Sequence, residues 1–237
     1  MRIGLFGGSF NPIHNAHIAL AKTICKEAKL DEVWFMVSPQ NPLKQAEDLL
    51  GENERYEMVK LALESRPSKS PLKGDFLSRT GSLPFREKSD VDNIGVCASG
   101  EWVLKASNYE FHLERPSYTW KTLRALKKDF PQHEFSLIIG GDNWVRFPRW
   151  AHSEEILANH NIYIYPREDS DINEALLPEN VHLVHTPKIN ITSTTIREMV
   201  KNGKDISALV PKAVAKTIAE KRYYSPPPTP PSGRVFR

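Results

Sequence analysis

The sequence of 237 residues predicts an α/β fold, a Rossmann-like parallel sheet with helices on both faces. Two patterns predict this class. Short apolar runs alternate with longer stretches of helical periodicity, which is the order that builds a parallel sheet. The first apolar run, residues 2–6, also passes through a glycine turn directly into a helical stretch at residues 18–28. Ligands of such sheets bind beyond the carboxyl ends of the strands, so residues at strand ends are the first site candidates.

Each element is placed from its own stretch of the chain. We expect strands where an apolar run is short and β-prone, at residues 2–6, 32–37, 109–112, 135–139, 161–165 and 181–184. We expect helices where apolar residues recur with a period near that of the α-helix, at residues 18–28, 53–64, 119–128, 153–158, 195–200 and 211–222.

The domain boundaries follow from two segments that lack any period. Residues 69–105 are rich in Ser, Pro, Gly, Lys and Asp, although the segments on either side have clear patterns. A long irregular connection is unusual in a compact domain, so we interpret it as an insertion, with a substrate lid as the sharper alternative. Residues 223–237 contain a proline run and are expected to form a flexible tail. Residues 1–222 are then one domain.

Composition argues against several classes of protein. The net charge is +3 with acids and bases interspersed, so no basic stripe suggests nucleic acid as a partner. No apolar run has membrane-spanning length and no signal peptide is recognisable, so we expect a cytoplasmic protein that binds no membrane. Cys25 and Cys97 lack metal-ligand spacing, and a helical Cys25 argues against a disulfide. The sequence leaves a homo-oligomer open.

The turn after the first strand has the chemistry of a phosphate-binding loop. It begins with Gly7, Gly8, Ser9 and Phe10. The two glycines let the backbone approach an anion without a Cβ in the way, close to the start of a helix. His14 and His17 are three residues apart, so both imidazoles can face the same ligand. The alternative is an ordinary strand-to-helix turn with two surface histidines.

A second segment near the C-terminus offers another anion site. Residues 191–197 read ITSTTIR, and their hydroxyls can cap a helix, with Thr195 and Glu198 fitting a capping box. The N–H groups of the first turn, the hydroxyls and the Arg197 guanidinium can together hold phosphate. Alone, this segment could be a capped helix with a surface arginine. Together with the first loop, we interpret it as the far wall of one triphosphate site.

Four segments carry a resemblance to a known family. Residues 8–17, GSFNPIHNAH, and residues 191–197 resemble the GSFxPxHxGH and ISSTxIR motifs of the nucleotidyltransferase superfamily. Asn11 stands where an acid is common, and Ala16 adds a methyl group where glycine is usual. Residues 116–123, PSYTWKTL, and the GGDN and FPRW sequences within 140–150 resemble segments of the nicotinate-nucleotide adenylyltransferases. The resemblance covers most of the chain outside residues 69–105 and the tail.

The resemblance implies adenylyl transfer from ATP to nicotinate mononucleotide, which gives deamido-NAD and pyrophosphate. It implies three catalytic residues, His14 and His17 on the α- and β-phosphates and Arg197 on the outer phosphates. The expected ATP contacts are Gly7, Gly8, Ser9, Phe10, Lys44, Asp142, Ile191, Ser193 and Thr194. Mg²⁺ is expected as the cofactor, bridging phosphate oxygens without a cage of protein ligands.

The expected mononucleotide contacts are Tyr118, Thr119 and Trp150. Trp150 can stack on the pyridine ring, and the helix start at Tyr118 can bind its carboxylate or amide. Simple packing and simple capping are the alternatives. Asp142 can bind ribose hydroxyls or cap the next turn, and Lys44 can reach a phosphate or stay solvated at the surface.

Several other functions compete with this one. Nicotinamide mononucleotide could be the preferred substrate, or the chain could be a nucleotide-binding homologue impaired by Ala16 or by the insertion. A phosphopantetheine transferase is disfavoured because those enzymes lack the pair formed by Tyr118 and Trp150. A class I synthetase fragment would need a KMSKS-like lysine motif, which this sequence lacks.

Overall fold

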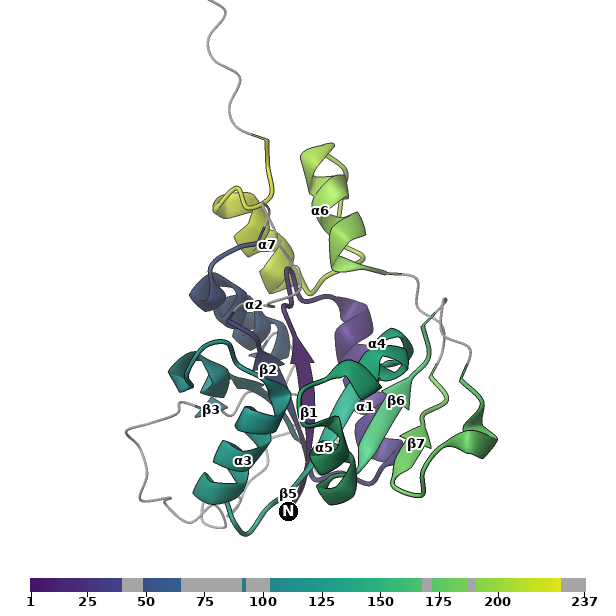
Figure 1. The fold of residues 1–237 in the computed structure, drawn as a ribbon. Helices are drawn as coiled ribbons and strands as arrows, with labels where there is room; N and C mark the ends of the chain where they lie inside the picture. The colour runs from purple at the N-terminus through teal and green to yellow at the C-terminus, as the bar shows by residue number, and fades with distance from the viewer. Residues whose placement is uncertain (40–48, 65–90, 93–102, 168–171, 187–190, 227–237) are drawn as a thin grey trace, which may run out of the picture.

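The computed structural model describes residues 1–39, 49–64, 91–92, 103–167, 172–186 and 191–226. Within this part of the chain, one sheet has seven strands in the order β3-β4-β2-β1-β5-β6-β7 (Figure 1). The strands are β1 (Arg2–Gly8), β2 (Glu32–Val37), β3 (Val91–Asp92), β4 (Val103–Ser107), β5 (Glu134–Gly140), β6 (Ile162–Tyr165) and β7 (Val181–Leu183). Every neighbouring pair is parallel except β3 with β4.

Helices cover both faces of the sheet. The α-helices are α1 (Asn15–Glu27), α2 (Glu52–Glu64), α3 (Thr119–Asp129), α4 (Gly141–Arg146), α5 (Ser153–Asn159), α6 (Ser193–Lys201) and α7 (Lys212–Glu220). The described residues also form three short 3-10 helices, η1 (Tyr109–His112), η2 (Phe147–Arg149) and η3 (Glu174–Leu176). Among the described helices, none has both the length and the apolar character needed to cross a bilayer.

Alternating side chains of the central strands divide the core into two layers. Phe6 and Phe35 pack in the layer that contains α1, α2 and α7. Leu5 and Trp34, their neighbours in sequence, pack in the opposite layer with α3 and α5. Successive side chains of a strand point to opposite faces, so an apolar strand such as β1 serves both layers. This confirms the predicted α/β class with helices on both faces.

The sheet has its topological switch point between β1 and β5. Strand order proceeds outward from β1 through β2 to β4, and on the other side from β5 through β6 to β7. Loops diverge at such a point and leave a crevice beyond the carboxyl ends of the strands. In Figure 1 these ends lie toward α6 and α7. The β1–α1 loop is therefore at the position where α/β sheets bind ligands.

One predicted strand is wrong. Residues 109–112 form η1, and the strand lies just before it as β4, paired in parallel with β2. The Phe111 amide donates to the Asn108 carbonyl at 2.8 Å, which closes a helical turn. The four residues YEFH form too short a run for their periodicity to separate a strand from a turn of helix. Sequence reasoning also missed the short helix α4.

Both predicted domain boundaries need adjustment. Strand β4 begins at Val103, inside the predicted insertion of residues 69–105, most of which lies outside the described residues. The predicted tail from residue 223 begins too early, because Tyr224 is only 9% exposed. Its hydroxyl donates to Asn11 Oδ1 at 2.7 Å, so the packed part of the chain reaches Tyr224. Residues 227–237, Cys97 and Lys44 lie outside the described residues.

Candidate functional site

The β1–α1 loop is anchored by an aromatic side chain. Phe10 has a left-handed backbone, φ 46°, and its ring is buried against Phe6 and Phe35 at centroid distances of 5.7 and 5.5 Å. A Cβ on Gly8 would lie 3.0 Å from the Phe10 ring, a tight contact that glycine avoids. The Phe10 side chain therefore packs in the core, and its predicted contact with ATP concerns the backbone of the loop.

His14 and His17 form a stacked pair at the start of α1. Their ring centroids are 3.6 Å apart, with the ring planes inclined by 21°. The His14 backbone N–H donates to His17 Nδ1 at 3.3 Å. A neutral imidazole that accepts at Nδ1 carries its proton on Nε2. His17 thus has an N–H donor on the side of the ring away from the helix backbone.

Burial keeps both imidazoles neutral near pH 7. It lowers the pKa of His14 to about 4, with a smaller contribution from the positive charge of Arg167. The pKa of His17 is also lowered well below its usual value, first by burial and then by His14 and Arg167. Within the described residues His14 Nδ1 is buried without a hydrogen-bond partner, which is costly unless a ligand supplies one.

The second sequence segment lies directly against the first. Ser193 Oγ donates to the Pro12 carbonyl and Arg197 Nη1 donates to the Asn11 carbonyl, both at 2.9 Å. The start of α6 therefore contacts the phosphate loop across 186 residues of sequence, as the interpretation of one shared site requires. Thr194 lies exposed in the first turn of α6.

The cap of α6 differs from the predicted one. Thr192 is the N-cap, and its hydroxyl accepts from the Thr195 amide at 3.1 Å. The predicted pairing of Thr195 with Glu198 is wrong because the helix begins two residues earlier, at Ser193. A run of four consecutive hydroxyl residues offers several equivalent caps, and contact with the loop selects among them.

Two cavities meet beside the loop. The smaller has a volume of about 110 Å³, and the predicted site residues in its wall are His14, His17 and Ile191. The larger has a volume of about 400 Å³, and the predicted site residues in its wall are Gly7, Gly8, Ser9, Tyr118, Thr119 and Trp150. Tyr165 lines both cavities, so they adjoin. The larger cavity thus brings the glycine turn of the predicted phosphate loop together with the predicted pyridine residues, and the two histidines lie in the adjoining smaller cavity.

Two further predicted residues can be placed. Asp142 lies in the first turn of α4, whose N-cap is Gly140, so Asp142 is not the cap. Its Oδ1 is 4.0 Å from Arg167 Nε, and it is not among the residues that line either cavity. Trp150 forms part of the wall of the larger cavity and packs at 5.4 Å against Phe147.

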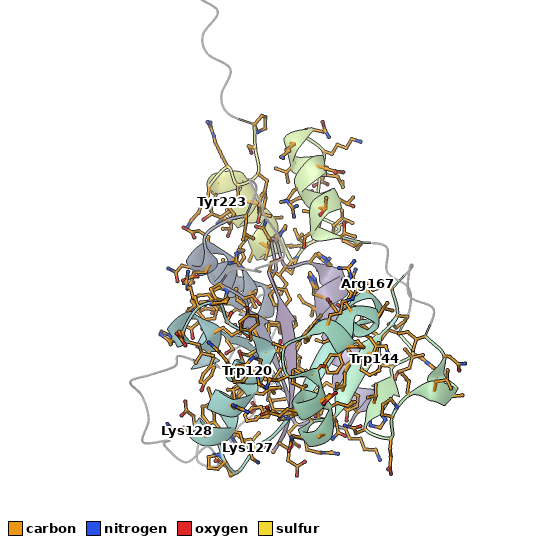
Figure 2. All side chains as sticks on the ribbon, viewed as in Figure 1. Trp120, Lys127, Lys128, Trp144, Arg167 and Tyr223 are labelled. Carbon is orange, nitrogen blue, oxygen red and sulfur yellow. The ribbon has the colours of Figure 1, made fainter. Side chains whose placement is uncertain are left out.

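Sequence reasoning missed two arginines. Arg167, labelled in Figure 2, follows β6 and lines the smaller cavity together with the histidine pair. Arg55 is fully buried in α2, and its guanidinium donates to the carbonyl groups of Ser9, Ser38, Pro39 and Leu50. Position at a strand end could have identified Arg167. Arg55 gives no local signal, because its partners come from three separate segments.

The donor set of the site suits phosphate better than a protein-bound metal. Imidazole, hydroxyl, guanidinium and backbone N–H groups are donors to anions. No group of three or more His, Cys, Asp or Glu side chains gathers anywhere in the described part of the chain. The residues present do not fit a magnesium cage, so a magnesium ion would fit here only when the phosphates of a nucleotide carry it.

The chain is similar to known proteins in both sequence and fold. A family model described as cytidylyltransferase-like matches residues 5–199. A Bacteroides fragilis protein named probable nicotinate-nucleotide adenylyltransferase is 40% identical over 220 residues, which is 93% of this chain and 92% of that protein. A Cytophaga hutchinsonii protein of the same name is 39% identical over 225 residues, covering 95% and 99% of the two chains.

The fold has solved counterparts. A structure of Plasmodium falciparum nicotinic acid mononucleotide adenylyltransferase complexed with NaAD superposes with a TM-score of 0.68. It covers 94% of this chain and 97% of that one, at 18% sequence identity. At this identity the similarity shows a shared fold, while the sequence relatives show the family.

Proposed function

The chain belongs to the nicotinate-nucleotide adenylyltransferases of the cytidylyltransferase-like family, and from this premise we propose that it transfers the adenylyl group of ATP to nicotinate mononucleotide. The products are deamido-NAD and pyrophosphate. One observation carries the proposal. The stacked histidine pair lines the smaller of two adjoining cavities and the glycines of the same loop line the larger one, so the β1–α1 loop borders the space proposed for both nucleotides.

The reaction needs no nucleophile from the protein. A phosphate oxygen of the mononucleotide attacks the α-phosphorus of ATP, and the bond from that phosphorus to the bridging oxygen of pyrophosphate breaks. Catalysis of such a transfer comes from alignment of the two phosphates and from stabilisation of the charge that grows on the leaving group. Hydrogen-bond donors held rigidly around the phosphates are therefore what the site must supply.

The histidines are proposed to contact the reacting phosphates. Buried His14, with Nδ1 unpartnered among the described residues, is proposed to bind the α-phosphate. His17 is proposed to donate from Nε2 toward the oxygen between the α- and β-phosphates, where charge develops. The backbone of Gly7, Gly8 and Ser9 is proposed to bind the same phosphates, since glycines permit close approach.

The start of α6 is proposed to hold the outer phosphates. Arg197, Ser193 and Thr194 are the ligands on this side, with Lys44 and Ile191 completing the site for ATP. In this structure Arg197 and Ser193 donate to loop carbonyls, and this contact supports the proposal that the outer phosphates bind between the loop and the start of α6. Asp142 is proposed to bind ribose hydroxyls, a role that requires it to turn from its position near Arg167.

The larger cavity is proposed to bind the mononucleotide. Trp150 supplies an aromatic face for the pyridine ring, and the N–H groups at the start of α3, next to Tyr118 and Thr119, bind its carboxylate. Mg²⁺ is proposed to enter with ATP and to neutralise phosphate charge. A cytoplasmic location and a homo-oligomer both stay predictions.

Pyrophosphate release tests the proposal. The assay supplies ATP and Mg²⁺ with nicotinate mononucleotide, nicotinamide mononucleotide or phosphopantetheine as acceptor. We expect turnover with nicotinate mononucleotide. A preference for nicotinamide mononucleotide would make that compound the proposed substrate. No turnover with any acceptor would favour an impaired homologue. An Ala16→Gly variant then tests the methyl group, which lies in the wall of the smaller cavity beside the histidines.

A further inference from the structure

A buried carboxyl group lies in the wall of the larger cavity, and the reaction does not use it. Glu110 belongs to η1 and is only 9% exposed. Its Oε1 accepts from Thr122 Oγ1 at 3.0 Å, and its Oε2 accepts from Ser117 Oγ at 3.5 Å. Both donors lie in the segment that enters α3, and all three residues line the cavity.

The same carboxyl group also reaches the end of β2. The Ser38 side chain donates a third hydrogen bond to Glu110. The Ser38 amide in turn donates to the Gly8 carbonyl at 3.0 Å, and the Ser38 carbonyl accepts from Arg55 at 2.9 Å. One chain of hydrogen bonds therefore connects the phosphate loop, β2, η1 and the start of α3.

The positions of Ser117 and Thr122 show that these hydrogen bonds hold the start of α3. They flank Tyr118 and Thr119, the residues at which α3 begins. Tyr118 is the N-cap of α3 and makes no side-chain capping bond, so the first-turn N–H groups lack the usual side-chain acceptor. The Glu110 carboxyl group accepts hydrogen bonds from the hydroxyls of Ser117 and Thr122, which lie on either side of this turn. The backbone N–H groups of the turn are then left for a ligand.

We propose that Glu110 is a positioning residue for the mononucleotide, which fixes the first turn of α3 against the end of β2 so that its N–H groups meet the pyridine substituent. The inference rests on the proposed function, because it assigns the larger cavity to the mononucleotide. Glu110, Ser117 and Thr122 line the larger cavity, whereas the histidine pair lines the smaller one, so we expect a change at Glu110 to act on the mononucleotide more than on ATP.

The burial of Glu110 supports a role in geometry. Burial raises the pKa of its carboxyl group, while hydrogen bonds from Thr122, Ser38 and Ser117 lower it. A buried carboxyl group is costly unless its oxygens are satisfied by well-placed donors. Here each donor comes from a segment that lines the cavity, so the group specifies how these segments sit relative to one another.

The test compares Glu110 with a second buried glutamate. Glu32 at the opposite end of β2 is 4% exposed, and its carboxylate accepts from Trp34 Nε1 at 2.6 Å and Lys105 Nζ at 2.7 Å. The variants are Glu110→Ala, Glu110→Gln, Thr122→Val and Glu32→Gln. Thermal midpoints and KM for each substrate are measured for all of them.

We expect Glu110→Ala to raise KM for nicotinate mononucleotide by about tenfold, which is the effect of a loss near 1.4 kcal/mol in binding. KM for ATP should stay within about twofold of wild type. Thr122→Val should act in the same direction with a smaller effect, and Glu110→Gln, which keeps an acceptor oxygen, should recover most of the loss. Glu32→Gln should lower the thermal midpoint alone. Equal rises in both KM values, or a lower midpoint alone in the Glu110 variants, would reduce Glu110 to a structural residue.

Amide hydrogen exchange separates this inference from the proposed function. Without any substrate, Glu110→Ala should speed exchange of the Thr122 amide, which closes the first turn of α3 by donating to the Tyr118 carbonyl at 3.1 Å, and Glu32→Gln should not. If wild type turns over no mononucleotide, the proposed function fails, and the exchange result alone still decides whether Glu110 holds this turn. Unchanged exchange in Glu110→Ala would overturn the inference even in an active enzyme.

Discussion

At the level of single residues, the histidine pair shows how burial selects a protonation state. A charged imidazole 3.6 Å from a second ring, beside Arg167, would add positive charge where little solvent is present. Both rings are therefore neutral, and each can act on phosphate only through a ring N–H. The hydrogen bond from the His14 amide fixes which nitrogen of His17 carries its proton.

Replacement of His17 by Ala tests its role at the leaving group. We expect kcat to fall by two to three powers of ten, roughly the effect of removing one donor that acts in the transition state. KM for ATP should change little. The control is His182→Ala, since His182 lies exposed on β7 and should leave kcat unchanged. Wild-type turnover in the His17 variant would exclude this role.

The depressed histidine pKa values predict acid sensitivity. The unfolded chain binds a proton at His14 near pH 6.5, whereas the folded chain does so only near pH 4. The free energy of unfolding therefore decreases as the pH is lowered from 6.5 toward 4. From His14 alone we expect the free energy of unfolding to drop by about 2 kcal/mol between pH 7.5 and pH 5.

Urea unfolding at the two pH values measures this effect. In His14→Gln the free energy of unfolding should decrease less between the two pH values, because only the contribution of His17 remains. An equal drop in wild type and variant would mean that His14 is not buried in its neutral form.

At the level of elements, Arg55 connects α2 to both loops that border the site. Its guanidinium donates to the carbonyls of Ser9 and Ser38 from one nitrogen, at 2.7 and 2.9 Å, and to Pro39 and Leu50 from the others. A planar group with five donors suits this divergent set of carbonyls, and a lysine ammonium does not. The helix therefore fixes the spacing between the ends of β1 and β2.

Arg55→Lys should lower the free energy of unfolding by about 2–3 kcal/mol, because several buried carbonyls lose a charged donor. KM for ATP should rise as well, since Ser9 belongs to the phosphate loop. Arg124→Lys is the control, because Arg124 is exposed and paired with Glu155, and it should stay close to wild type. Equal midpoints of chemical denaturation for the two variants would contradict the role given to Arg55.

At the scale of the whole molecule, the C-terminal segment of the described chain contacts the loop after the first strand through the side chain of Asn11. Asn11 Oδ1 accepts from the Tyr224 hydroxyl at 2.7 Å, while the Asn11 carbonyl accepts from Arg197. Tyr224 lies in the segment after α7, next to Tyr223, which is labelled in Figure 2. Asn11, one of the two residues that depart from the motif of the resembled family, is thus the one that receives the C-terminal segment.

Tyr224→Phe should lower the free energy of unfolding by about 1 kcal/mol, the usual net effect of one buried hydrogen bond. The matched control is Tyr223→Phe, whose ring is half-buried beside Lys221 and Tyr224. Thermal or urea unfolding measures both variants. A loss of equal size in the two would show that the Asn11 contact is not what holds this segment.

The sequence by itself determined the α/β class, the bounds of β2, the glycine turn after β1 and the hydroxyl-rich start of α6. These features are local, because an apolar run, a glycine turn and a hydroxyl-rich helix start depend on neighbouring residues. The sequence analysis also predicted that the two segments lie together, and the hydrogen bonds from Ser193 and Arg197 to the loop confirm it.

Only the tertiary structure decided the remaining features. It placed the strand at β4 and made residues 109–112 a helical turn, and it chose Thr192 as the cap of α6. It also brought Arg55, Glu110 and Tyr224 to partners distant in sequence. Hydrogen bonds between buried polar groups far apart in the chain leave no periodic pattern, so their partners are fixed only when the sheet and its helices have packed.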